Sequence, residues 1–267
     1  MVRVVLAPAE GLLLRRLRWL RCAHCREVTH SSHPCHRHAC PWCLPWLHVL
    51  LDLLFPRRCV LCLVPGSTLC AACVSALPRL VPPLCARCGA PVAWPVTRCR
   101  ECSGRRLAFG SARAAVAYDA GVQTLVSAWK ERGLRDLASL SGAIVADVVI
   151  CPSAHAITFV PEDGDRSLKR GHHPAARLAR VLGRCWDLPV RPLLRRTRQL
   201  RPQRGLGREE RRRNVQGAFV ADSVRGRVVL VDDVYTTGAT VSAAASALRR
   251  AGASSIEVVT FARAVRR

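Results

Sequence analysis

The chain has 267 residues, half of them hydrophobic, which is enough for one well-packed core and a smaller accessory module. Its longest apolar run, residues 44–55, is shorter than the roughly 18 residues of a membrane helix and includes His48 and Asp52, so we expect no membrane insertion. The first apolar stretch is brief and is followed by arginines, which argues against a secretory signal and favours a cytoplasmic protein.

The formal net charge of +24 at pH 7 has two explanations. A strongly basic chain suits a polyanionic partner such as nucleic acid. Lysine, however, occurs only at Lys130 and Lys169, and abundant arginine and alanine with scarce lysine is the composition that a GC-rich genome produces. The densest cluster, Arg191 to Arg213, lies where the chain is expected to bind a phosphorylated ligand, so that ligand could account for part of it.

Residues 1–49 show no sustained periodicity. Their Cys-x2-Cys pairs, Cys22 with Cys25 and Cys40 with Cys43, could bind zinc. A disordered tail, or translated sequence upstream of the true start, explains the segment better, because coherent patterns begin near Leu50.

Residues 50–104 form a cysteine module with four Cys-x2-Cys pairs. The eight cysteines are Cys59, Cys62, Cys70, Cys73, Cys85, Cys88, Cys99 and Cys102. Paired cysteines at these spacings indicate metal binding in a reducing compartment, and two four-thiolate zinc sites of the structural kind fit them best. We expect neighbouring pairs to share a metal, although interleaved pairs also fit. Frequent prolines forbid long helices here, so metal must supply stability.

Residues 105–267 alternate between strand and helix patterns. We predict strands at 114–118, 157–160, 228–231 and 256–261, and helices at 122–130, 137–148, 175–182 and 241–250, with Gly183 and Gly252 ending the last two helices. This alternation predicts an α/β fold with a mostly parallel sheet covered on both faces and ligands at the carboxyl ends of its strands. The Gly- and Arg-rich stretch 195–217 is predicted to be a mobile loop.

Several single residues allow simpler interpretations. Trp129 is expected in the core, and Cys151 and Cys185 are expected to be buried thiols. Lys130 and Asp136 suit either solvated surface charges or functional residues.

The most informative motif follows the apolar strand at 228–231. It consists of Asp232 and Asp233, then Val-Tyr, then Thr236-Thr237-Gly238-Ala239-Thr240 at the start of a helix. Helix N–H groups and threonine hydroxyls can bind a phosphate, and glycine lets the backbone approach it closely. Carboxylates can accept hydrogen bonds from ribose hydroxyls. The motif therefore predicts a site for a phosphorylated ribose, above all phosphoribosyl pyrophosphate (PRPP).

The motif resembles the PRPP-binding signature of type I phosphoribosyltransferases, and the chain from Leu50 to Arg263 resembles the ComF family, the competence-associated, GntX-like proteins. The further matching stretches are Leu53–Cys59, Ala128–Lys130 with Gly133, Arg135–Ala138, Lys169–Gly171, Gln203, Leu206, Arg211 and Arg213–Phe219. The resemblance implies a type I phosphoribosyltransferase fold behind an N-terminal double zinc ribbon.

The resemblance also implies roles for individual residues. Asp232 and Asp233 would be catalytic and contact the ribose, and Thr236, Thr237, Gly238, Ala239 and Thr240 would hold the 5′-phosphate. Lys169, Arg170 and Gly171 would lie near the pyrophosphate with Mg²⁺. A flexible loop with Gln203, Arg208, Arg211, Arg213 and Asn214 would close over the site and exclude water.

Two departures from the family pattern bear on catalysis. His172, His173 and Pro174 replace the usual aromatic, Asn and polar residue after Arg-Gly, and the two histidines could serve as general acid or base. The stretch 162–165 carries three acids that would repel pyrophosphate unless magnesium intervenes.

The leading hypothesis is a phosphoribosyltransferase that transfers phosphoribose to an unknown acceptor, with a link to DNA uptake that the family resemblance implies. Its rivals are a single-stranded DNA-binding competence protein and a PRPP-sensing regulator without turnover. Against DNA binding, Trp94 is the single tryptophan that the cysteine module offers for base stacking.

Overall fold

The computed structural model describes residues 57–134, 136–162, 173–197 and 217–265. The chain divides into two compact units, Met1–Phe55 and Pro56–Arg267, and every described residue belongs to the second. The extension 1–49 lies outside the described residues, and the predicted domain boundaries stay predictions. Within the described ranges, no helix is both long enough and apolar enough to cross a membrane.

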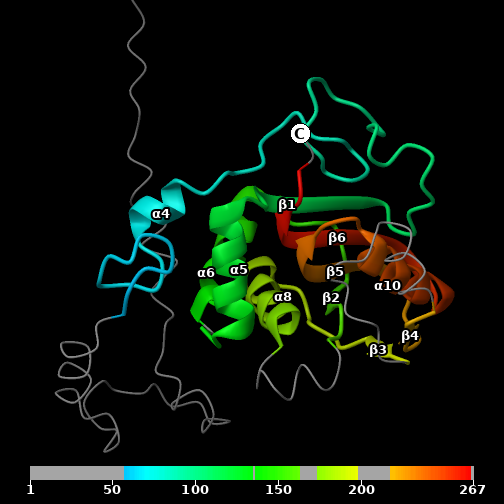
Figure 1. The fold of residues 1–267 in the computed structure, drawn as a ribbon. Coiled ribbons are helices and arrows are strands. Elements are labelled where there is room, and N and C mark those ends of the chain that lie inside the picture. The colour runs from blue at the N-terminus through cyan, green and yellow to red at the C-terminus, as the bar shows by residue number, and fades with distance from the viewer. Residues whose placement is uncertain (1–56, 135, 163–172, 198–216, 266–267) are drawn as a thin grey trace, which may run out of the picture. The chain divides into compact units, whose positions relative to one another are not determined.

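Four parallel strands form the central sheet, in the order β1-β6-β5-β2 (Figure 1). The strands are β1 (Ser111–Ala117), β2 (Ala156–Phe159), β5 (Gly226–Tyr235) and β6 (Ala253–Arg263). Because every neighbouring pair is parallel, the carboxyl ends of all four strands lie at one edge of the sheet. The predicted fold class is confirmed, and so is the expected position of strand 228–231 inside the sheet.

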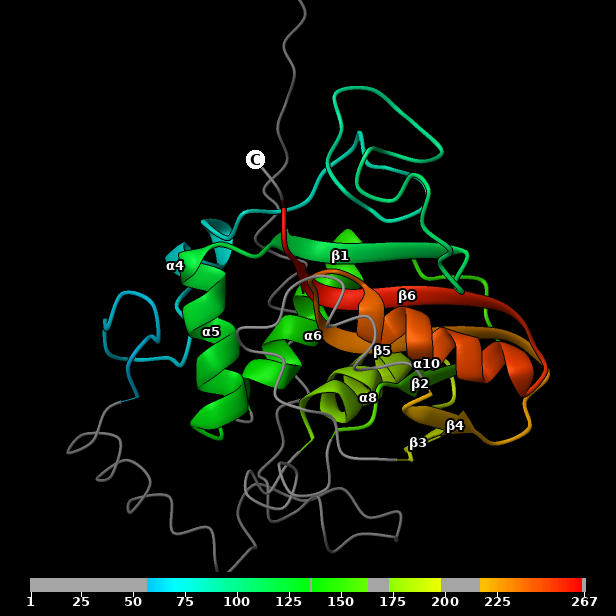
Figure 2. The same cartoon turned by 45° about the vertical axis from the view of Figure 1, so that its right-hand side comes forward.

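Helices cover both faces of this sheet (Figures 1 and 2). The helices are α5 (Ala120–Glu131), α6 (Asp136–Val148), α8 (Pro174–Trp186) and α10 (Ala239–Arg250). Val229 and Val231 of β5 pack in one core cluster with α5, α6 and α8, while Val228 and Leu230 pack in a second cluster with α10. An unbroken apolar run is what a parallel strand buried on both faces requires. Trp129 is fully buried in the first cluster, as expected.

From residue 57 onward, the cysteine module contains one short helix, α4 (Ala71–Ser75), between turns. Its two halves join different core clusters. Cys59 and Leu69 belong to the cluster of α5, whereas Cys85 and Cys88 belong to the cluster of α10. The second half therefore shares its core with the helix that follows the acid pair.

Two sequence predictions were wrong: the position at which α8 ends, and the burial of two cysteines. The helix does not end at Gly183 but continues to Trp186, and Asp187 ends it with a left-handed backbone (φ 53°). Gly183 is instead a packing residue, because a Cβ there would lie 2.6 Å from a methyl carbon of Val190. Cys185 and Cys151 are exposed rather than buried.

The stretch predicted as a loop from 195 to 217 begins as a strand. β3 (Leu194–Arg196) pairs antiparallel with β4 (Phe219–Ala221). Three-residue strands are too short to show an alternating pattern, so neither strand was predictable from periodicity. Residues 198–216 between the two strands lie outside the described residues.

Candidate functional site

The acid pair, Asp232 and Asp233, lies inside β5 and not after it. The strand was predicted to end at residue 231, but it continues to Tyr235 because Asp232 pairs with Thr260 of β6 and Val234 pairs with Ala262. Successive strand residues point to opposite faces, so the two carboxylates leave the sheet edge in different directions.

Asp233 has a partly buried cationic partner. It is 9% exposed and forms an ion pair with Lys130, which lies in the last turn of α5. Asp119 caps the start of α5 by accepting a hydrogen bond from the Val122 N–H at 2.8 Å. The structure thus brings Lys130 to the site, whereas Asp136 forms an exposed ion pair with Arg57 at 2.8 Å.

Asp232 is electrostatically different from its neighbour. Burial, followed by the adjacent Asp233 carboxylate, raises the pKa of Asp232 to about 7, although Lys130, the Asp233 N–H and Arg196 oppose the rise. The Asp233 N–H donates to Asp232 Oδ1 at 2.9 Å. Near neutral pH the Asp232 carboxyl group therefore exchanges a proton readily, and it can both accept from and donate to hydroxyl groups.

The loop from Thr236 to Gly238 leads into α10, which begins at Ala239, two residues before its predicted start. Gly238 is the N-cap, with φ 71° and no side-chain hydrogen bond to the helix. Thr237 Oγ1 accepts from the Ala239 N–H at 3.3 Å. The N-cap itself has no side chain to bind the next N–H groups, and N–H groups at a helix start are the usual donors to a phosphate.

The Tyr235 side chain packs against this loop at Gly238. Its ring is 3% exposed, and a Cβ on Gly238 would lie 2.3 Å from its Oη. Only glycine fits, because it has no Cβ and tolerates this positive φ. The Tyr235 Oη is buried without a hydrogen-bond partner among the described residues. Sequence reasoning passed over Tyr235, although it stands inside the motif.

Arg196 and His173 lie on the β2 side of the acid pair. Arg196 Nε donates to the Pro161 carbonyl at 2.7 Å, just beyond the end of β2. His173 caps α8, its Nδ1 accepting from the Ala176 N–H at 3.2 Å, and its ring packs edge-on against Phe159. Burial lowers the pKa of His173 to about 4, so the ring is neutral at physiological pH. The structure therefore gives His173 a capping role.

Most of the remaining predicted site residues lie outside the described residues. They are Lys169, Arg170, Gly171, His172, Gln203, Arg208, Arg211, Arg213 and Asn214. Their roles stay predictions. Arg196 was missed because nothing distinguishes it in sequence from the other arginines around it.

The eight paired cysteines form two tetrads, Cys59/Cys62/Cys70/Cys73 and Cys85/Cys88/Cys99/Cys102, and within each tetrad all sulfur atoms lie within 4.8 Å of one another. This is the sequential grouping. In the second tetrad, the Sγ atoms of Cys88 and Cys99 lie 3.5 Å apart, and those of Cys85 and Cys102 lie 3.7 Å apart. Tetrahedral zinc with bonds of about 2.3 Å places its sulfurs about 3.8 Å apart, so the donor set fits zinc. None of these thiols forms a disulfide.

Backbone N–H groups aim at the tetrad sulfurs. The Cys99 N–H donates to Cys85 Sγ at 3.2 Å, and the Cys70 N–H lies 3.5 Å from Cys59 Sγ. Burial disfavours both thiolates, but such hydrogen bonds outweigh it and lower the pKa of Cys59 to about 6 and that of Cys85 to about 7. Burial and hydrogen bonds between the thiols raise the pKa values of Cys62, Cys73, Cys88 and Cys102, so zinc would displace protons from these thiols when it binds.

Comparison with known proteins matches this architecture. The chain matches the Double zinc ribbon domain family over residues 50–103 and the Phosphoribosyl transferase domain family over residues 168–267. It is 28% identical to "Competence protein F" of Haemophilus influenzae over 79% of this chain and 98% of that protein. It is 30% identical to "DNA utilization protein YhgH" of Salmonella typhi over 77% of this chain and 96% of that one.

Two further similarities are more distant. "Competence protein ComFC" of Bacillus subtilis is 25% identical over 77% of this chain and 88% of its own length. Among solved structures, the glutamine PRPP amidotransferase of B. subtilis complexed with ADP and GMP is 24% identical, with a TM-score of 0.33, over 46% of this chain and 25% of that one. The extent and identity of the full-length matches, with both domain matches, decide the assignment: the chain belongs to the ComF family of phosphoribosyltransferase-like, competence-associated proteins with an N-terminal double zinc ribbon.

Proposed function

We propose that the chain binds PRPP with Mg²⁺ at the carboxyl edge of its sheet and transfers the phosphoribosyl group to an acceptor, releasing pyrophosphate. The observation that carries this proposal is one continuous arrangement. Asp232 and Asp233, the second of them buried, lie near the end of β5, and α10 begins shortly after them behind its N-cap Gly238. The first part suits ribose hydroxyls and the second suits the 5′-phosphate.

Each described residue then has a defined task. Lys130 fixes the Asp233 carboxylate, which accepts from a ribose hydroxyl, while Asp232 can donate to or accept from the neighbouring hydroxyl. The α10 N–H groups bind the phosphate. Mg²⁺ bound with PRPP would neutralise charge on the leaving pyrophosphate.

The transfer itself breaks one bond and forms another. The bond from ribose C1 to the pyrophosphate oxygen breaks, and its electron pair stays on pyrophosphate. The nucleophilic atom of the acceptor forms the new bond to C1 and loses its proton. Arg196, fixed beside the end of β2, adds positive charge on the side where β2 meets the acid pair.

The direct test is calorimetric titration of PRPP with magnesium into zinc-loaded protein, beside the Asp232→Asn/Asp233→Asn variant. Binding that the variant loses supports the site and justifies screening acceptor bases for pyrophosphate release. A folded, zinc-loaded wild type that does not bind PRPP would exclude the enzyme. Binding without turnover on any acceptor would favour a PRPP-sensing regulator.

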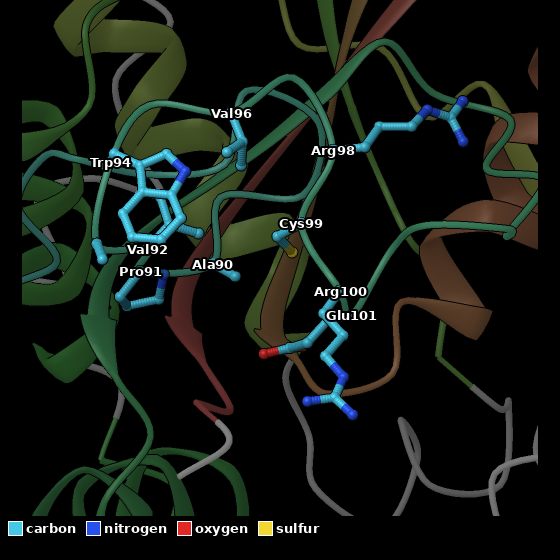
Figure 3. Close-up of a pocket in the computed structure, with 10 residues that line it drawn as sticks. Ala90, Pro91, Val92, Trp94, Val96, Arg98, Cys99, Arg100 and Glu101 are labelled. Carbon is cyan, nitrogen blue, oxygen red and sulfur yellow. The ribbon is translucent and has the colours of Figure 1, made fainter.

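A second candidate function, binding of single-stranded DNA, is favoured by a hollow in the second half of the cysteine module (Figure 3). Trp94 lines it and is 70% exposed, and Arg98 and Arg100 stand on the same segment with side chains that extend away from Trp94. Bases can stack on an exposed indole while arginines contact phosphates. The names of two relatives, which refer to competence and DNA utilization, agree with such a ligand.

Salt-dependent binding of an oligonucleotide tests the second candidate. Affinity for the oligonucleotide should fall steeply as the salt concentration rises. It should also drop in Trp94→Ala, but not in Val81→Ala, which changes another exposed hydrophobic residue. Unchanged binding in Trp94→Ala would remove the hollow from consideration. The free thiols of both tetrads support a cytoplasmic location, which we propose for either function.

A further inference from the structure

Arg263, the last residue of β6, is a buried cation between the second cysteine tetrad and the loop before α10. It is 1% exposed, although it lies at the carboxyl end of β6, where the strands of the sheet end. A guanidinium is taken out of water only where fixed partners compensate it. Its partners therefore reveal what the residue is for.

On one side, Arg263 contacts the tetrad. Its Nη1 donates to the carbonyl oxygen of Cys88, and its Nη2 lies 3.6 Å from Cys88 Sγ. The same Nη2 donates to Glu101 Oε2 at 2.9 Å, and Glu101 immediately precedes Cys102. Four thiolates around one Zn²⁺ leave a formal charge of about −2, which a buried guanidinium offsets. Arg263 therefore touches both halves of this metal site.

On its other side, Arg263 stacks on Tyr235. The guanidinium carbon lies 4.7 Å from the centre of the Tyr235 ring, a cation–π distance. Tyr235 in turn packs behind Gly238, which fixes the start of α10. A second contact runs parallel to this one, since Arg105 Nη2, just after the tetrad, donates to the Thr237 carbonyl at 2.5 Å.

We propose that Arg263 is a positioning residue that makes the geometry of the phosphate-binding loop depend on zinc in the Cys85/Cys88/Cys99/Cys102 tetrad. Loss of that zinc frees the cysteines that hold Cys88 and Glu101 in place, so the guanidinium loses its fixed partners. Tyr235 then loses its stacked partner and Gly238 its support. The first tetrad lies in the other core cluster, so its zinc does not act on the loop. The consequence for PRPP rests on the function proposed above.

Arginine is required for this role, because its planar fork reaches Cys88 and Glu101 while its face stacks on Tyr235. Arg263→Lys keeps the charge but loses the fork, so it tests geometry with little change in net charge. Arg263→Met removes the charge as well. Arg227→Met is the matched control, since Arg227 is an exposed arginine at the opposite end of neighbouring β5.

Three readouts follow the full-length zinc-loaded protein: the rate of zinc release to a chromophoric chelator, hydrogen exchange of amides 236–241 without ligand, and calorimetric affinity for PRPP with magnesium. In Arg263→Lys, one of the two zinc ions should leave about tenfold faster, amides 236–241 should exchange faster, and PRPP binding should weaken about tenfold. Arg227→Met should change none of these.

The first two readouts need no PRPP, so they separate this inference from the proposed function. A wild type that fails to bind PRPP, with exchange at 236–241 still dependent on Arg263, overturns the function and leaves the coupling standing. A folded Arg263→Lys with wild-type zinc release and wild-type exchange overturns the coupling. If Arg263→Met does not fold, partial zinc removal from the wild type replaces it: exchange at 236–241 must rise as the second tetrad empties.

Discussion

Lys130 and Asp233 form an ion pair between the last turn of α5 and the end of β5, with side chains that are 25% and 12% exposed. The pair joins α5 to β5, and more than half of the α/β domain's sequence separates these two elements. It fixes one carboxylate of the acid pair and leaves the other, Asp232, as the member that exchanges protons. The site therefore depends on a lysine outside the signature motif.

Replacing Lys130 by Met should weaken both the fold and the site. The Asp233 carboxylate would remain largely buried without this cation, which we expect to cost about 2 kcal/mol of unfolding free energy in urea denaturation. PRPP affinity should also fall, because the carboxylate loses its orientation. Arg132→Met removes the same charge from an exposed position nearby and should have little effect. Equal losses in the two variants would contradict a specific role for Lys130.

Asp232 should make stability depend on pH. Its pKa is raised from 3.8 in the unfolded chain to about 7 in the fold, first by burial and then by Asp233. Between these values the folded state binds more protons, so wild-type stability is lost as pH rises from about 4 to 7. Below that window Asp232 is protonated in both the folded and the unfolded state, so it no longer makes the stability depend on pH.

Asp232→Asn removes this titration. Its unfolding free energy should exceed that of the wild type by about 2 kcal/mol at pH 8, and the difference should vanish near pH 4. Chemical denaturation at several pH values measures both curves. Parallel curves across the window would show that Asp232 titrates normally.

Much of the fold was predictable from local sequence. The run 228–231 identified a strand buried on both faces, and the spacing of the cysteine pairs identified both tetrads. These features are visible because each depends on residues close together in the chain. Predictions failed where a distant partner decides the outcome. Gly183 resembles a helix end, yet it is a packing residue against Val190.

The site shows the same division. The acid pair and Gly238 were predicted from one motif, whereas Lys130 remained ambiguous and Arg196, Tyr235 and Arg263 were missed. An arginine is recognisable as a buried structural cation only when its environment is known, and this chain is so rich in arginine that composition hides the exceptions. Arg263 depends on Cys88 and Glu101, which come from a different part of the chain.

The purified chain should contain two zinc ions, each held by one tetrad. Cys62→Ser in the first tetrad and Cys99→Ser in the second should each reduce the count to one, because three thiolates bind zinc far more weakly than four. Native mass spectrometry measures the count directly. Simultaneous loss of both metals from either variant would indicate a shared or interleaved arrangement.

Gly238→Ala should damage the site through both conformation and space. The new Cβ would lie 2.3 Å from Tyr235 Oη, and the backbone φ of 71° is unfavourable for alanine. We expect an unfolding free energy about 2 kcal/mol lower and PRPP binding reduced below detection by calorimetry.

Gly133→Ala separates the two effects. Gly133 has φ 66°, but a Cβ there meets nothing within 4 Å, so this variant has the backbone strain without the clash. It should lose only about 1 kcal/mol and keep its PRPP affinity. If both variants lose the same stability and both still bind PRPP, the contact between Tyr235 and Gly238 does not shape the loop. If only Gly238→Ala loses binding, close packing of Tyr235 against an unsubstituted backbone is what holds the start of α10 in position for a phosphate.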